Sequence, residues 1–218
     1  MPEIIFNGPE GRLEGRYKHS NVPNAPLALI LHPNPEQGGT MNNRMTYTMF
    51  QTFADRGFST LRFNFRGVGR SQGEYGQGEG ELCDAAAALD WLQGINPNSS
   101  GVWVAGFSFG AWIGMQLLMR RPEIDGYVSI APPANLYDFN FLAPCPNEGL
   151  IVQGNNDEIV SMESVEKLIE KLVEQRGPKG VDYRVVDGAG HFFNDDVETV
   201  VGHVNDYLDQ AMSQEAAA

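Results

Sequence analysis

Short, strand-like runs alternate along this chain with segments whose apolar residues recur at helical spacing. The runs at 27–32, 58–65, 102–107, 126–131, 149–154 and 181–188 read as strands, and the most apolar of them are typical of strands buried on both faces of a sheet. Helices are expected at about 45–56, 81–91, 109–119, 165–176 and 197–208. This alternation predicts an α/β fold, with a mostly parallel central sheet and helices on both faces.

The N-terminal part departs from this alternation. Segments 3–8 and 12–19 read as two strands around the turn GPEG, so we expect them to form an antiparallel edge of the sheet. The chain has 218 residues, of which 42% are hydrophobic, so one domain spanning 1–218 can bury a sizeable core. The end, at about 212–218, is expected to be a frayed tail.

Charge and cysteine content exclude several classes of function. The 28 acidic residues exceed the 15 basic ones, giving a formal charge of -13 with no Lys/Arg-rich run, which argues against nucleic-acid and membrane partners. The N-terminus lacks the pattern of a signal peptide, and no apolar stretch reaches the roughly 18 residues of a membrane span, so a cytoplasmic protein is expected. Cys83 and Cys145 stand 62 positions apart without metal-ligand spacing, which predicts reduced structural thiols and no metal site.

The stretch Gly106-Phe107-Ser108-Phe109-Gly110 lies where an apolar strand passes into an apolar helix. A turn this sharp leaves room only for small residues two positions before and two after its centre, which the two glycines provide. It exposes the central hydroxyl, so the stretch is typical of a nucleophile elbow. G-x-S-x-G also occurs by chance, and the alternative is a loop serine without chemistry.

A serine hydroxyl needs a base, and the base needs an acid to orient it. Asp157 follows the strand at 149–154, and His191 lies in a glycine-flanked loop after the strand at 181–188, so both fall at carboxyl ends of strands. The order Ser108, Asp157, His191 is the one that a nucleophile-elbow fold uses. Glu158 could replace Asp157 as the acid, and Asp157 could merely cap a turn.

The oxyanion of an acyl-transfer reaction needs two hydrogen-bond donors. One is expected from the backbone N–H of Phe109, and the other from Asn34, because the prolines on either side of it have no N–H. Glu36 or Gln37 could serve instead, and His32 is expected to orient the loop by hydrogen bonds rather than to act in catalysis. The segment GVGRSQG does not have dinucleotide-site spacing.

That glycine-rich segment is therefore expected to be a structural loop. Its candidate anchors are polar residues on both sides of it: Arg66, Ser71, Glu81 and Asp84. No organic cofactor is expected.

The elbow, the acid and the histidine resemble those of the α/β-hydrolase superfamily over about residues 3–213. The segments LHPNPEQGGTMNNR, LRFNFRGVGRSQG, GEGELCDAAAALDWL, AGFSFGAW and GAGHFF together resemble small bacterial hydrolases described as serine esterases. The resemblance implies the triad Ser108, Asp157 and His191 and an oxyanion donor at Asn34. It implies no particular substrate.

Only 17 residues separate the strand-like runs ending at 131 and beginning at 149, which is too short for a helical lid domain. An open site is expected, edged by the aromatic residues Tyr137, Phe139, Phe141 and Phe192; local packing of these rings is the alternative. We therefore expect a lidless serine hydrolase acting on small carboxylic esters or thioesters through an acyl-enzyme. The alternatives are a peptidase or amidase of the same fold and a non-catalytic binding protein on this scaffold.

Overall fold

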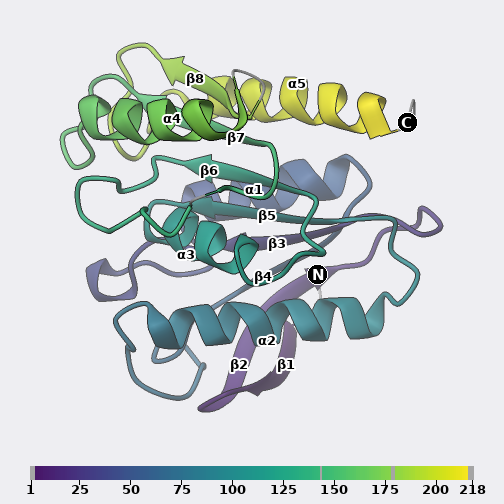
Figure 1. The fold of residues 1–218 in the computed structure, drawn as a ribbon. Helices are drawn as coiled ribbons and strands as arrows, with labels where there is room; N and C mark the ends of the chain where they lie inside the picture. Colours follow the sequence, from purple (N-terminus) through teal and green to yellow (C-terminus); the bar gives the residue numbers. More distant parts are fainter. Residues whose placement is uncertain (1–2, 143, 178–179, 216–218) are drawn as a thin grey trace.

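The computed structural model describes residues 3–142, 144–177 and 180–215, and their centre is an eight-stranded sheet (Figure 1). The strand order is β1-β2-β4-β3-β5-β6-β7-β8. The strands are β1 (Glu3–Gly8), β2 (Gly11–Lys18), β3 (Leu27–Leu31), β4 (Ser59–Phe63), β5 (Val102–Phe107), β6 (Gly126–Ile130), β7 (Gly149–Gly154) and β8 (Asp182–Val186). β2 pairs antiparallel with β1 and β4, and every other pair is parallel. The predicted α/β fold with an antiparallel N-terminal edge is confirmed.

In the described part of the chain, five α-helices cover the two faces of this sheet. One face carries α2 (Glu79–Ile95), α3 (Phe109–Leu118) and α4 (Met162–Arg176), and the other carries α1 (Arg44–Asp55) and α5 (Val197–Glu215) (Figure 1). Each face has its own apolar core, because alternate side chains of the central strands point to opposite sides. The central strands β3 to β7 are buried along their whole length, as their apolar sequences predict.

Two local features differ from the sequence-based expectation. α5 continues to Glu215, so the frayed tail expected from about 212 does not begin there; residues 216–218 lie outside the described part. The helix is retained because Ala211 and Met212 still pack against the core. A short 3-10 helix, Pro35–Gln37, also forms in the loop after β3, where no element was expected.

The glycine-rich loop after β4 is held by the polar residues expected to anchor it. Arg66 forms an ion pair of 2.8 Å with Asp84 of α2, and both side chains are almost wholly buried. Ser71 donates to the carbonyl of Asn64 at 2.7 Å, while the Glu81 carboxylate accepts from the N–H groups of Gly76 and Gly78. The loop is therefore fixed to β4 and to the start of α2.

The connection from β6 to β7 carries no helix in its described residues, so the expected absence of a lid domain agrees with the structure.

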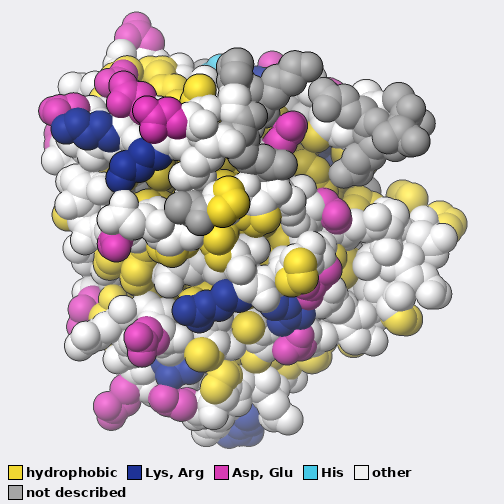
Figure 2. All heavy atoms as spheres, viewed as in Figure 1, with side chains coloured by type: hydrophobic (Ala, Val, Ile, Leu, Met, Phe, Trp, Pro, Cys, Tyr) yellow, Lys and Arg dark blue, Asp and Glu magenta, His cyan; other side chains and the backbone are white. Residues whose placement is uncertain are grey.

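On the face over α2, α3 and α4, Lys and Arg side chains lie scattered among acidic and apolar ones (Figure 2). None of the helices described here combines the length and the apolar character needed to cross a membrane.

Candidate active site

Ser108 stands at the turn between β5 and α3, where the backbone is strained. Its φ of 53° and ψ of -118° lie in a region that favours glycine. The turn is held by its backbone, since the Ser108 N–H donates to the Ile130 carbonyl at 2.8 Å. A Cβ atom at Gly106 would overlap the backbone of Gly110, and one at Gly110 would overlap the backbone of Leu31. The two glycines are therefore required by close packing around the elbow.

The three residues of the expected triad are hydrogen-bonded to one another. His191 Nε2 lies 3.1 Å from Ser108 Oγ, and His191 Nδ1 lies 2.8 Å from Asp157 Oδ2. With its proton on Nδ1, the ring donates to the carboxylate and offers Nε2 as acceptor to the serine hydroxyl. The alternative acid, Glu158, is exposed to solvent, so Asp157 is the carboxylate that meets the histidine.

The Asp157 side chain is inaccessible to solvent and remains suited to the ionised form. Burial by itself would raise the pKa of this carboxyl, but hydrogen bonds from His191 and from the backbone N–H groups of Val160 and Ile159 lower the pKa below its usual value. A carboxylate that stays ionised can hold the imidazole in one orientation and stabilise its protonated form.

Gln153 is a further residue at this site, and the sequence analysis did not single it out. It lies at the end of β7 with its side chain fully buried, and its Nε2 donates to Asp157 Oδ2 at 3.0 Å. The same Nε2 lies 3.2 Å from the Val160 carbonyl. The signal in the sequence was a lone polar residue in the apolar run GLIVQG. Gln153 holds the acid in place from the sheet side.

The loops that carry the acid and the base are tied to each other. The N–H of Asn156 donates to the carbonyl of Ala189 at 3.1 Å, and the Asn155 side chain accepts from the N–H of Gly188 at 2.7 Å. These bonds join the two residues before Asp157 to the segment just before His191. The distance between acid and base is therefore set by a small network rather than by the two side chains alone.

The expected oxyanion donors lie at the ends of neighbouring parallel strands. Asn34 follows β3 and Phe109 begins α3, and β3 pairs with β5. Among the described residues, neither backbone N–H has a protein acceptor, as expected of groups that would bind an oxyanion. Phe109 also stands at the N-terminus of a helix, where the backbone favours negative charge.

His32 occupies the position between β3 and this loop and is fully buried. Its Nδ1 lies 2.7 Å from the Pro33 carbonyl, and its Nε2 accepts from the N–H of Phe65 at 3.0 Å. Burial lowers its pKa to about 4, although the hydrogen bond to Pro33 acts in the opposite direction. The ring is therefore neutral at pH 7 with the proton on Nδ1, and it links the ends of β3 and β4, as expected for a residue that orients the loop.

The four aromatic residues expected to edge the site do not share one environment. Tyr137 is half-buried and stacks on Trp112 with ring centroids 4.3 Å apart. Phe139 is buried and stacks on Phe141 at 5.9 Å, which is local packing within the connection between β6 and β7. Phe192 is 52% exposed beside the His191 ring, with centroids 5.2 Å apart. Tyr137 contacts Asn34 and Phe109, and Phe192 contacts His191, so these two rings adjoin the expected site residues.

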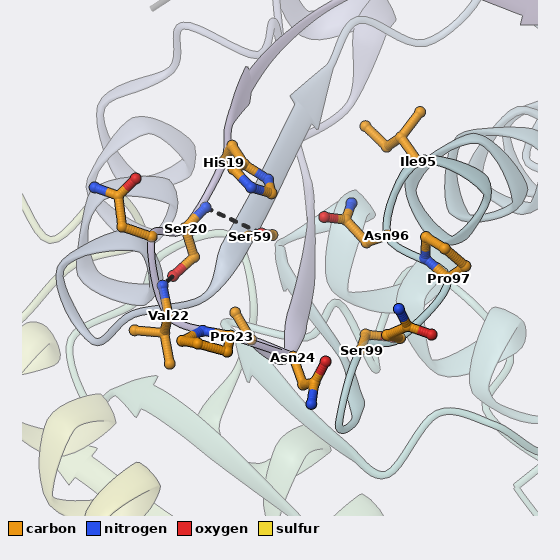
Figure 3. A pocket seen from close by; sticks show the side chains of 13 residues that line it. His19, Ser20, Val22, Pro23, Asn24, Ser59, Ile95, Asn96, Pro97 and Ser99 are labelled. Atoms are coloured by element: carbon orange, nitrogen blue, oxygen red, sulfur yellow. Dashed lines mark hydrogen bonds between the residues drawn. The ribbon is translucent and has the colours of Figure 1, made fainter.

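A separate hollow of about 430 Å³ lies at the other end of the parallel strands, away from Ser108 (Figure 3). Its lining includes His19 after β2, Ser59 at the start of β4, and the segment 95–99 before β5. These are the amino ends of the parallel strands, whereas Ser108 follows the carboxyl end of β5. In parallel α/β sheets, reactive groups gather at the carboxyl ends, so this hollow is not part of the triad site.

Comparison with known proteins places the chain in a family. A family model described as X-Pro dipeptidyl-peptidase (S15 family) matches residues 21–167, which include Ser108 and Asp157. The uncharacterized protein RP471 of Rickettsia prowazekii (strain Madrid E) is 53% identical over 211 residues, covering 95% of this chain and 89% of that protein.

Solved structures agree with this assignment. A protein of unknown function from Agrobacterium tumefaciens, provisionally assigned to the α/β hydrolases, is 58% identical with a TM-score of 0.95, covering 98% of both chains. An α/β serine hydrolase homologue from Coxiella burnetii is 33% identical with a TM-score of 0.84, covering 95% of this chain and 97% of that one. A serine hydrolase without a lid from Xanthomonas campestris is 28% identical with a TM-score of 0.86, covering 96% of this chain and 94% of that one. The chain therefore belongs to the α/β hydrolases, in the family whose model is described as X-Pro dipeptidyl-peptidase (S15 family).

Proposed function

We propose that this protein is a serine hydrolase that cleaves small carboxylic esters or thioesters through an acyl-enzyme. The observation that carries the proposal is the position of His191, whose two ring nitrogens lie within hydrogen-bond distance of Ser108 and Asp157. A serine with a positioned base, and a base with a buried acid, is the arrangement that activates a hydroxyl nucleophile. Its substrate partner would be a small molecule.

In the proposed reaction, His191 Nε2 takes the proton of Ser108 as Oγ attacks the carbonyl carbon of the substrate. The carbonyl oxygen becomes an oxyanion, held by the backbone N–H groups of Asn34 and Phe109. Collapse breaks the bond to the leaving oxygen or sulfur, which receives the proton from His191. Water then attacks the acyl-enzyme as His191 Nε2 takes its proton. The second oxyanion collapses, the carboxylic acid is released, and His191 returns the proton to Ser108 Oγ. The steps need no cofactor or metal.

The ester preference is supported by the openness of the site. In its described residues, the connection between β6 and β7 forms no helix that could cover Ser108, which supports a site without a lid. Esters and thioesters have better leaving groups than amides and require less binding energy to reach the transition state. We also propose that this activity is cytoplasmic, as expected from the sequence analysis.

A peptidase activity is the second candidate, and the match to the X-Pro dipeptidyl-peptidase family model favours it. The same triad would then attack an amide carbonyl, and His191 would protonate a leaving amine. The two candidates are separated by comparing p-nitrophenyl acetate and butyrate with X-Pro p-nitroanilides. The ester proposal expects kcat/KM to be at least about a hundredfold higher for the esters, and a higher value for the anilides would replace it.

The proposed nucleophile is tested with a fluorophosphonate probe, which labels activated serines covalently. Wild-type protein is expected to be labelled at Ser108, while Ser108→Ala is expected to be unlabelled and to lose ester hydrolysis with an unchanged thermal unfolding midpoint. Absence of labelling in folded wild-type protein would favour the third reading, a binding protein that uses this scaffold without catalysis.

A further inference from the structure

The turn formed by residues 33–39, which carries Asn34, is held mainly by its own backbone. The Asn34 carbonyl accepts from the N–H groups of Gln37 at 3.1 Å and Gly39 at 2.9 Å, and its Oδ1 accepts from the N–H of Glu36 at 2.8 Å. Among the described residues, a single hydrogen bond joins this turn to a distant segment: Asn34 Nδ2 donates to the hydroxyl of Tyr137 at 3.1 Å. The placement of the turn therefore depends on Tyr137 and on the attachment of the chain at His32.

Tyr137 itself is held from several sides. Its ring stacks on Trp112 of α3 at an angle of 20°, and its N–H donates to the Pro133 carbonyl at 3.0 Å. Trp112 is fixed in turn, because its indole N–H donates to the Asp138 carbonyl at 3.0 Å. Burial raises the pKa of Tyr75, and the nearby Tyr137 adds to the shift, so the Tyr75 hydroxyl stays neutral beside it. Tyr137 can therefore act as a rigid anchor.

The same residue also contacts the second proposed oxyanion donor. The Tyr137 ring packs edge-on against Phe109 with centroids 5.8 Å apart and an angle of 66°. Its hydroxyl thus touches one donor residue, Asn34, and its ring touches the other. Asn34 comes from the loop after β3 and Phe109 from the start of α3. Tyr137, which contacts both, comes from the loop after β6.

We infer that Tyr137 is a positioning residue, which sets the Asn34 and Phe109 backbone N–H groups to converge on one oxyanion before substrate arrives. The inference rests on the proposed function, because it concerns the oxyanion of that reaction. Donors fixed in advance stabilise the developing charge without a cost of reorganisation in the transition state. Both acylation and deacylation pass through an oxyanion, so Tyr137 acts on kcat and leaves ground-state binding nearly unchanged.

The test uses Tyr137→Phe, which removes the hydroxyl and keeps the ring. We expect kcat for p-nitrophenyl butyrate to fall about tenfold, the effect of one lost hydrogen bond, with KM within about twofold of wild type. A phenylboronic acid, which forms a tetrahedral adduct with the serine, is expected to bind weaker by the same factor as kcat/KM. The matched control is Tyr17→Phe, because Tyr17 donates to Asn96 Oδ1 at 2.9 Å. Asn96 lines the hollow at the other end of the parallel strands, away from the triad site (Figure 3). That control is expected to keep wild-type kinetics.

A second variant, Asn34→Ala, breaks the same bond from the turn, also removes the Oδ1 acceptor of the Glu36 N–H, and keeps the backbone N–H of residue 34. We expect a loss of kcat at least as large as that of Tyr137→Phe, and the double variant is expected to lose no more than Asn34→Ala alone. The inference is overturned if Tyr137→Phe has wild-type kcat, if its loss lies in KM alone, or if the two losses multiply. A wild-type protein that shows neither labelling nor hydrolysis would instead contradict the proposed function, so the two failures are distinguishable.

Discussion

Gly110 lies so close to Leu31 that any Cβ atom at position 110 would overlap the Leu31 carbonyl oxygen. This approach brings the start of α3 against the end of β3, and it places the Ser108 turn beside the Asn34 turn. The glycine is therefore part of the fold at the point where the proposed nucleophile and oxyanion donors meet.

The first prediction follows from this contact. Gly110→Ala is expected to lower the free energy of unfolding by about 2 kcal/mol, because neither backbone can yield without moving a strand or a helix. Labelling of Ser108 by the fluorophosphonate is expected to slow at the same time. Gly94→Ala is the matched control: Gly94 lies in α2, and apart from the backbone of its own helix no atom lies within 4 Å of the added methyl group, so this change is expected to stabilise by roughly 0.5–1 kcal/mol. Urea denaturation measures both, and equal stabilities would contradict the prediction.

Asp157→Asn tests the acid at two levels. At neutral pH we expect kcat to fall roughly 10³- to 10⁴-fold, as the imidazole loses its charged partner and its fixed tautomer. Because the pKa of Asp157 is lowered in the folded state, its contribution to stability is present above the ordinary carboxyl pKa of about 4 and is lost as pH falls through the lowered value. The Asp157→Asn variant should therefore lose less unfolding free energy than wild type as the pH is lowered, which urea denaturation at several pH values measures.

The control for that experiment is Glu158→Gln, since Glu158 adjoins the acid but is exposed. Its kcat and its stability profile at low pH are expected to match those of wild type. A large loss of activity in Glu158→Gln, with a small one in Asp157→Asn, would reverse the assignment of the acid.

The lowered pKa of His32 predicts a second pH dependence of the folding stability, at higher pH than that of Asp157. Its pKa is about 4 when folded, below the ordinary value of 6.5, so the unfolded chain binds the proton more readily between these values. The stabilising effect is therefore complete above pH 6.5 and is lost as pH falls toward 4, by on the order of 3 kcal/mol. Urea midpoints measured from pH 7 to pH 4 should show a steep slope in wild type and a shallow one in His32→Gln.

His203 supplies the comparison for that slope. Its pKa is also lowered, first by burial and then by Arg184, so it contributes in the same direction. Its burial is incomplete, so His203→Gln should retain most of the wild-type slope. If the His203 variant loses more of the slope than the His32 variant, the assignment to His32 is wrong.

The ion pair between Arg66 and Asp84 gives a prediction about stability alone. Asp84→Asn leaves a buried guanidinium with Glu10 as its remaining carboxylate, and it is expected to cost about 3 kcal/mol of unfolding free energy. Asp90 forms a surface ion pair with Arg121, and its side chain is 66% exposed. Asp90→Asn is therefore expected to change the free energy of unfolding by less than about 0.5 kcal/mol. Thermal and urea denaturation of the two variants provide the check.

Much of the fold could be predicted from the sequence because its elements have clear periodicity. The strands β5 and β7 begin and end where the apolar runs do, and the stripe from Val165 to Val173 lies inside α4. Helix ends were less accurate: α2 extends several residues beyond the predicted 81–91 in the C-terminal direction, since the position at which it ends depends on its C-cap at Asn96, which lies outside the predicted range.

The candidate site divides in the same way. By itself, the sequence determined the turn around Ser108 and predicted the order in which the candidate acid and base follow it, because glycine spacing and strand ends are local properties. Only the tertiary structure decided between Asp157 and Glu158, brought Gln153 onto the acid, and set Tyr137 between Asn34 and Phe109. These are contacts between side chains of different loops, and their geometry depends on how the strands are ordered and twisted in the sheet, which no local pattern of residues encodes.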